Sequence, residues 1–189
     1  MENNFNIIIT GVGGQGIITL LQVIDEAAFV EGYDVKSSEL HGLSQRGGSV
    51  EAHIRFGKKV FSPMVSNGNT DLIIALEALE GLRESSKAGR TPGVPPKLLV
   101  NEYFLPFMGF PAREEILKQL KNAILVPASQ ICKDKLQNEV VCTMYLLGYA
   151  VNKKLIPLKE ESVSSAIKRV IPQKYLDLNV KAFELAFKQ

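Results

Sequence analysis

The segment from Phe5 to Gly16 constrains the fold of this chain more than any other stretch. It reads FNIIITGVGGQG, an apolar run that leads into four closely spaced glycines, and a long apolar helix pattern follows directly. This order predicts a buried strand, a tight turn and the start of a helix. In an open α/β sheet, such a turn lies at the carboxyl end of a strand, where ligands bind. Glycine permits close approach of the backbone, and the amides at a helix start attract negative charge. The segment therefore predicts a site for an anion or phosphate.

The rest of the chain alternates between strand and helix patterns, which indicates an α/β protein with a mostly parallel sheet. We expect a Rossmann-like open sheet with helices on both faces, a β-hairpin insertion near Ser49 to Phe61, and additional C-terminal helices. We also expect one domain over residues 1–189. Strands are predicted at Tyr33 to Glu39, Ser49 to Phe56, Asp71 to Leu76, Lys97 to Val100 and Ala123 to Val126, with Val60 and Phe61 as the return strand of the hairpin. Helices are predicted at Ile17 to Glu31, from Glu77, at Ala112 to Lys121, from Asn138 to about Val151, at Lys159 to Val170 and after Pro172.

Charge and composition narrow the classes of partner. The 22 basic and 20 acidic residues give a net charge of +2, which offers no electrostatic reason to bind nucleic acid or an anionic membrane. Hydrophobic residues make up 46% of the chain, as in an ordinary globular protein. The first nine residues, MENNFNIII, have neither the basic region nor the length of a signal peptide or membrane helix. We expect a cytoplasmic protein.

The glycine turn has the form of a dinucleotide fingerprint. Gly11, Gly13 and Gly16 satisfy G-x-G-x-x-G, and Glu39 lies 23 residues further on, near the place of an acid that binds a ribose. This evidence supports two interpretations equally: a site for NAD or FAD, and a tight junction between strand and helix with no ligand. The remaining chain is short for the substrate domain that a dinucleotide enzyme needs.

A second candidate feature is the loop HGLSQRGG, from His41 to Gly48. Arg46, Gly47 and Gly48 can present a guanidinium and open backbone amides to one anion. Taken alone, the motif favours the alternative, a surface turn with a solvated arginine. The neighbouring glycine turn strengthens the functional interpretation. His41 is placed to hydrogen-bond a ligand, whereas we expect His53 to be exposed on the polar side of its strand. The predicted binding residues are Gly11, Gly13, Gly14, Gln15, Gly16, His41, Arg46, Gly47 and Gly48.

The sequence shows no catalytic apparatus or metal site of its own. Cys132 and Cys142 lack the spacing of a zinc pair and are too few for a four-cysteine iron–sulfur site, so we expect two reduced, buried thiols. The chain has no Ser-His-Asp pattern and no Walker A sequence. Its catalytic residues are therefore unknown at this stage.

Several of these motifs, in the same order, resemble the gamma-type subunit of 2-oxoacid:ferredoxin oxidoreductases. They are FNIIITGVGGQGI, SSELHGLSQRGGSVEAHIRFG, SP followed by TDLIIALE, NEVVCTMYLLGYAV and NVKAFE. The resemblance spans nearly the whole chain and is closest to the small (beta) subunit of indolepyruvate ferredoxin oxidoreductase. HGLSQRGG favours that branch, because the pyruvate branch usually has a tyrosine-glycine pair before the arginine.

The resemblance implies a pyruvate/ketoisovalerate oxidoreductase catalytic domain that acts as an accessory subunit. The complex would oxidatively decarboxylate an aryl-2-oxoacid with coenzyme A, form an acyl-CoA and pass electrons to ferredoxin. Thiamine diphosphate and [4Fe–4S] clusters would belong to a large (alpha) partner subunit, and this chain would be inactive alone. Coenzyme A is the first ligand we expect at the glycine and arginine loops.

Two other functions remain open from the residues alone: an autonomous NAD- or FAD-binding protein, and a sensor or scaffold domain. For the subunit, the candidate partner surfaces are the apolar stretch from Tyr103 to Pro111 and the C-terminal helices.

Overall fold

A computed structural model describes residues 4–41, 48–87, 95–105 and 111–188 of the chain. Its centre is a six-stranded sheet in the order β2-β3-β1-β4-β5-β6. β3 runs antiparallel to both of its neighbours, and the other pairs are parallel. The strands are β1 (Phe5–Val12), β2 (Asp34–His41), β3 (Ser49–Gly57), β4 (Leu72–Ala75), β5 (Lys97–Asn101) and β6 (Ile124–Val126). The predicted mostly parallel α/β sheet is therefore confirmed.

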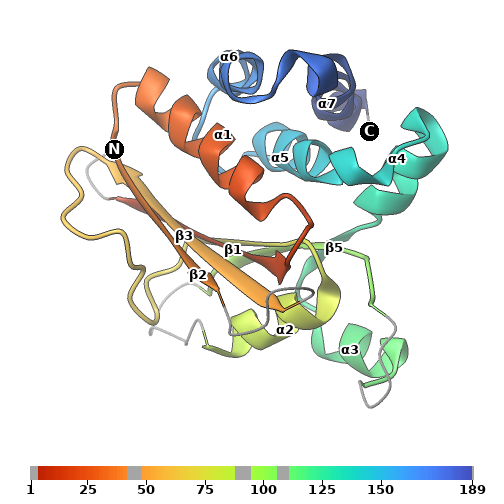
Figure 1. Cartoon of the computed structure of the whole chain (residues 1–189). Coiled ribbons are helices and arrows are strands. Elements are labelled where there is room, and N and C mark those ends of the chain that lie inside the picture. The colour runs from red at the N-terminus through yellow and green to blue at the C-terminus, as the bar shows by residue number, and fades with distance from the viewer. Residues whose placement is uncertain (1–3, 42–47, 88–94, 106–110, 189) are drawn as a thin grey trace.

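Helices cover both faces of the sheet, as expected. Figure 1 shows α1, α5, α6 and α7 on one side and α2 and α3 on the other. The helices are α1 (Ile17–Val30), α2 (Ala78–Lys87), α3 (Arg113–Gln119), α4 (Ala128–Leu136), α5 (Cys142–Asn152), α6 (Glu160–Val170) and α7 (Gln173–Leu185), with short 3₁₀ turns η1 (Glu139–Val141) and η2 (Ala186–Lys188). In the described part of the chain, no helix is both long enough and apolar enough to cross a membrane.

Apolar side chains of β1 point alternately to the two faces of the sheet, and this explains why helices or loops must cover both faces. Ile7 and Ile9 point into the large core under α1 and α5, while Ile8 points the other way, against Val65 and Ile73. A strand that is apolar on both faces is typical of the centre of a sheet with helices on each side. β1 is therefore the buried strand that its sequence predicts.

The β-hairpin predicted over Ser49 to Phe61 does not form, because its second strand was predicted wrongly. β3 pairs with β2 and β1, and neither Val60 nor Phe61 belongs to a strand. Val60 is buried and its amide donates to Asp34 Oδ2 at 2.8 Å, whereas Phe61 is 82% exposed. The turn at residues 57–59 suggested a local partner, but the longer β2 offers a full register of eight pairs.

His53 is buried, which corrects the expected exposure. The residue is 3% exposed because Val65, in the segment after β3, covers this face of the sheet. The Val65 amide donates to Nδ1 at 3.1 Å, and Nε2 lies 2.7 Å from Glu51 Oε1. These contacts fit a ring whose hydrogen is on Nε2 and is donated to the carboxylate. His53 therefore has a structural role in the sheet.

α5 lies in the same layer as α1, α6 and α7, and its sequence is apolar on nearly every side. Nine of its eleven residues are buried. Asn138 accepts a hydrogen bond from the Val140 amide at 2.9 Å and so caps η1, which leads into α5. Gly148 allows α7 to approach, because a Cβ there would clash with the backbone oxygen of Phe183.

Asp25 is a half-buried carboxylate between α1 and β2, and it makes stability depend on pH. Ser37 Oγ donates to its Oδ2 at 2.6 Å, while no described residue bonds its buried Oδ1. Burial raises the pKa of Asp25 from 3.8 to about 6, and the Ser37 hydrogen bond opposes this only in part. A raised carboxylate pKa means that ionisation costs stability as pH rises from 3.8 through 6.

We predict that Asp25→Asn stabilises the chain at neutral pH, because an amide keeps an acceptor for Ser37 without the buried charge. The gain at pH 7 should be on the order of 2 kcal/mol and should disappear below about pH 4. Urea unfolding from pH 4 to pH 8 measures it. Asp177→Asn, at an exposed position on α7, is the control and should give a flat difference. A pH-independent effect of Asp25→Asn would contradict this account.

Candidate functional site

The turn after β1 is built as its four glycines predict. β1 ends at Val12, and α1 begins at Ile17. Gly14 and Gly16 have φ values of +96° and +81°, in the left-handed region that a side chain disfavours. Gly16 is the N-cap of α1, and its carbonyl accepts from the Leu20 amide at 3.0 Å. The turn therefore delivers the chain from the sheet edge straight into the helix.

The side chain of Gln15 folds back beneath this turn. Its Oε1 accepts from the Val12 amide at 2.9 Å, and its Nε2 donates to the Leu76 carbonyl at 3.3 Å. Gly11 makes room for it, because a Cβ there would lie 2.6 Å from Gln15 Oε1. The side-chain amide of Gln15 thus links the ends of β1 and β4 and fixes the shape of the turn.

The structure brings the glycine turn together with the end of the second predicted loop. The Gly13 amide donates to the Gly48 carbonyl at 3.0 Å. Arg46 and Gly47 lie outside the described residues, while His41 is the last residue of β2 and pairs with Val50. The predicted proximity of the two loops is therefore seen at Gly13 and Gly48.

Glu39 does not lie where a ribose-binding acid would be needed. β3 separates β2 from β1, so Glu39 is two strands away from the glycine turn. Glu39 pairs with Ala52, and Ala52 pairs with Ile9, which places it level with the middle of β1. In dinucleotide-binding folds the acid follows the strand next to β1. This register speaks against the NAD or FAD interpretation.

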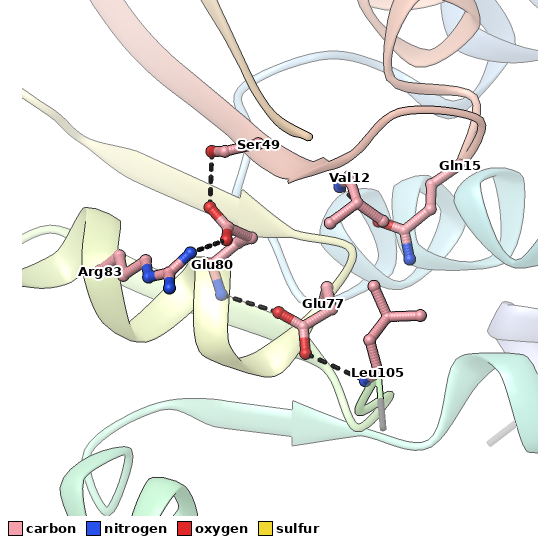
Figure 2. Close-up of polar contacts among 7 residues, drawn as sticks. All are labelled: Val12, Gln15, Ser49, Glu77, Glu80, Arg83 and Leu105. Carbon is pink, nitrogen blue, oxygen red and sulfur yellow. Dashed lines mark hydrogen bonds and ion pairs between the residues drawn. The ribbon is translucent and has the colours of Figure 1, made fainter. Parts of the chain in front are cut away.

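Three glutamates of the Glu77–Glu84 segment are buried beside the site, and the sequence analysis missed them. Figure 2 shows Glu80 between Ser49, whose Oγ donates to Oε2 at 2.6 Å, and Arg83, which forms an ion pair with it. Glu84 is buried one turn further along α2. Their spacing of three and four residues places them on one helix face. This spacing was the available signal, but it is equally typical of an exposed face.

Glu77 ties the start of α2 to the segment after β5. Its Oε2 accepts from the Glu80 amide at 2.8 Å, and its Oε1 accepts from the Leu105 amide at 3.4 Å (Figure 2). Burial raises the pKa of Glu77, and the nearby Glu80 carboxylate adds to this, while the backbone hydrogen bonds lower it. The Glu77 carboxylate therefore stabilises the start of α2 through these hydrogen bonds, while burial of its charge costs free energy.

A second side-chain amide continues the network across the sheet edge. Asn101, at the end of β5, donates from Nδ2 to the Leu76 carbonyl at 3.1 Å and to Ser129 Oγ at 2.8 Å. Its Oδ1 accepts from the Ser129 amide at 3.2 Å, which anchors the start of α4. The Leu76 carbonyl thus accepts from both Gln15 and Asn101. Together these amides join the ends of β1, β4 and β5.

A small cavity of about 140 Å³ borders the turn at Gly14 and Gln15, opposite Ser129 and Cys142. It is below the roughly 300–1,000 Å³ that is typical of sites for drug-sized ligands. Taken alone, this cavity does not enclose a large ligand.

The family model for pyruvate ferredoxin/flavodoxin oxidoreductase matches residues 6–189, which include the glycine turn and the helices that cover it. The chain belongs to this oxidoreductase family. The resemblance drawn from the sequence motifs is thereby confirmed.

Curated members of the oxidoreductase family match along nearly their whole length. An indolepyruvate oxidoreductase subunit of Thermococcus kodakarensis is 34% identical over 195 residues, which cover 97% of this chain and 95% of that protein. One from Archaeoglobus fulgidus is 33% identical over 191 residues, covering 97% and 94%. The common gamma subunit of pyruvate/ketoisovalerate oxidoreductases from Pyrococcus abyssi is 29% identical over 184 residues, covering 95% and 93%.

Solved structures share the fold at low sequence identity. The gamma subunit of a keto/oxoacid ferredoxin oxidoreductase from Geobacter sulfurreducens superimposes with a TM-score of 0.71 at 22% identity, over 97% of this chain and 96% of that one. A 2-oxoglutarate:ferredoxin oxidoreductase from Magnetococcus marinus, with 2-oxoglutarate, coenzyme A and succinyl-CoA bound, gives 0.74 at 19% identity. The match covers 98% of this chain and 31% of that longer one.

The cysteines of this family member are buried and free, as expected. Burial raises the pKa of Cys132 to about 12, with a smaller contribution from the neighbouring Cys142. Such a thiol is a poor nucleophile at neutral pH. Across the described ranges, no cluster of three histidine, cysteine or acidic side chains has the arrangement of a metal site.

We predict that Gln15→Met destabilises the chain by about 1–3 kcal/mol, because the Val12 amide loses its acceptor and the Leu76 carbonyl loses one donor. Gln15→Glu keeps the acceptor and loses the donor, so its loss should be smaller than that of Gln15→Met. Urea unfolding at pH 7 measures both.

The matched control is Gln22→Met, which makes the same change at an exposed position of α1. It should alter stability by less than about 0.5 kcal/mol. If Gln15→Met costs no more than this control, the side chain does not brace the turn and is available to contact a ligand.

Proposed function

We propose that this chain is the small subunit of a 2-oxoacid:ferredoxin oxidoreductase of the indolepyruvate type. The complex decarboxylates an aryl-2-oxoacid, joins the acyl group to the sulfur of coenzyme A, releases carbon dioxide and passes the electrons to ferredoxin. The observation that carries the proposal is the match to indolepyruvate oxidoreductase subunits over 97% of this chain and about the whole of theirs.

The remaining groups of this reaction belong to the large subunit in our proposal. Thiamine diphosphate supplies the carbanion chemistry of decarboxylation, and [4Fe–4S] clusters carry the electrons. This chain has only Cys132 and Cys142, which do not make a four-cysteine set, and both are buried. The candidate contact surfaces are the C-terminal helices and the stretch from Tyr103 to Pro111, of which residues 106–110 lie outside the described structure.

Within the complex, we assign the glycine turn and the arginine loop to a phosphate of coenzyme A. The hydrogen bond from Gly13 to Gly48 supports this assignment, because it holds Gly48, two residues after Arg46 in the sequence, beside the glycine turn. Gly14 leaves its backbone open, since a Cβ there would meet nothing within 4 Å. The acidic side chain of Glu80 accepts from Ser49, the residue after Gly48, so a phosphate there needs a cation, and Arg46 is the nearest one in the sequence.

The proposal predicts that this chain co-purifies with a large chain that carries thiamine and ferredoxin-like cysteine motifs. The pair should reduce a viologen dye only when indolepyruvate and coenzyme A are both present. Each subunit alone should be inactive, because neither holds the whole set of reacting groups. Failure to form a complex, or dye reduction by this chain alone, would refute the assignment as an accessory subunit.

The coenzyme A contact is tested by Arg46→Ala in the assembled complex. We expect the KM for coenzyme A to rise about tenfold or more, because a hydrogen bond to a charged group is lost, with little change in the KM for the oxoacid. Lys133→Ala, which removes an exposed cation from α4, outside the candidate contact surfaces, is the control and should leave both constants unchanged. The proposed contact would be refuted if the KM for coenzyme A is unchanged in Arg46→Ala and neither the chain nor the complex binds coenzyme A.

A further inference from the structure

A second and larger cavity lies on another side of the glycine turn. It measures about 530 Å³ and lies between the start of α1, η1, the first turn of α5 and the start of α7. This volume is within the range of small-molecule sites. Its apolar wall includes Val140, Tyr175 and Leu178. Val140 is 71% exposed, so its side chain is accessible to a ligand.

The lining of this cavity includes the hydroxyl of Thr143, which no described residue hydrogen-bonds. Thr143 is 4% exposed. A Cβ built on Gly16 would lie 3.6 Å from Thr143 Cγ2 and 3.9 Å from Oγ1, so the hydroxyl is beside the first turn of α1. The Thr143 oxygen is not among the fully buried, unpaired side-chain oxygens of the described residues, so it is reached from the cavity. A ligand in the cavity can therefore hydrogen-bond it.

The first turn of α1 presents positive potential at the same place. α1 has 14 residues, no side chain caps its N-terminus, and no acidic residue lies in its first turn. Gly16 and Thr19 of this turn line the cavity. The amides at the start of a long helix favour an anion when no carboxylate of the protein neutralises them.

The charge of the residues that line the cavity also favours an anion. Lys174, on α7, is the only charged side chain among the described residues that line the cavity. Its Nζ lies 4.5 Å from the centroid of the Tyr175 ring. Of the salt bridges found among the described residues, none involves Lys174. The cavity lining thus combines an ammonium, a helix start and a hydroxyl with apolar side chains.

We propose that this cavity binds a small organic anion, with a carboxylate or phosphate beside Gly16, Thr143 and Lys174. Its apolar body, of about the size of an aromatic ring system, lies against Val140, Tyr175 and Leu178. The site goes beyond the proposed function and does not depend on it. It uses the side of α1 that faces α7, whereas the proposed coenzyme A contact lies between Gly14 and the arginine loop.

The first test compares charged and neutral probes on the full-length chain. Indole-3-acetate and phenyl phosphate supply the two anionic head groups, and indole-3-acetamide is the neutral match of the first. We expect at least one anion to bind about tenfold or more tightly than the amide in calorimetric titration. The tighter anion identifies whether the site prefers a carboxylate or a phosphate. Equal binding of the amide and both anions would overturn the proposal.

Two variants locate the binding. Thr143→Val keeps the volume of the side chain but removes the hydroxyl, and Lys174→Gln removes the charge. Each variant should weaken binding of the tighter-binding anion about three- to tenfold and leave binding of the amide unchanged. Thr143→Ser should restore binding of the anion. Lys181→Gln removes an exposed lysine from the same helix outside the cavity and should have no effect. Unchanged anion binding in both Thr143→Val and Lys174→Gln would overturn the site.

A measurement on the unaltered chain removes any dependence on how the variants fold. Amide chemical shifts recorded during titration should move for Gly16, Thr19 and Thr143 and saturate with the calorimetric constant. Shifts confined to other surfaces would refute the location. The result is independent of the coenzyme A test, because Arg46→Ala should leave this binding unchanged.

Discussion

β1 is hydrogen-bonded along both edges, and the position of the site depends on this. It pairs antiparallel with β3 on one side and parallel with β4 on the other. The first pairing brings Gly48 beside Gly13, and the second brings Leu76 beside Gln15. The Leu76 amide also donates to the Thr10 carbonyl at 2.8 Å. The register of one buried strand therefore fixes both walls of the glycine turn.

The same register explains why a formal dinucleotide fingerprint is misleading here. An antiparallel strand inserted beside β1 displaces β2 by one position, about 4.8 Å further from the turn. Glu39, the acidic residue that follows the fingerprint in sequence, is then too far from the glycine turn. It lies level with the middle of β1 and not with the carboxyl end of that strand. The motif specifies a tight strand–turn–helix junction, and the strand order decides which ligand such a junction can bind.

Much of the fold follows from local patterns. The glycine turn, the buried α5 and most strands have clear periodicity and strong end signals, so their existence was predictable. α4 was missed because it is short, starts after Pro127 and has only a weak apolar face. The pairing of β3 with β2 was missed because it is a contact across the long loop between them, and an equally plausible local turn was present.

The candidate site shows a similar division. The conformations of Gly14 and Gly16 could be predicted, because a turn of this kind requires φ values that only glycine adopts easily. The inward fold of Gln15 could not, because it depends on Leu76, which is distant in sequence. The burial of His53 and Glu80 also depends on segments that arrive from elsewhere in the chain. Polar residues on alternating or helical faces are usually solvated, so their burial has no local signal.

The distribution of charge around the turn distinguishes its two sides. The buried carboxylate of Glu80 accepts from Ser49, the residue after Gly48, and forms an ion pair with Arg83. An anion on that side therefore requires a further cation. On the side that faces α7, Lys174 is the only charged lining residue described, and the start of α1 adds positive potential. The turn can thus hold an anion on its α7 side without help, whereas its other side depends on the arginine loop.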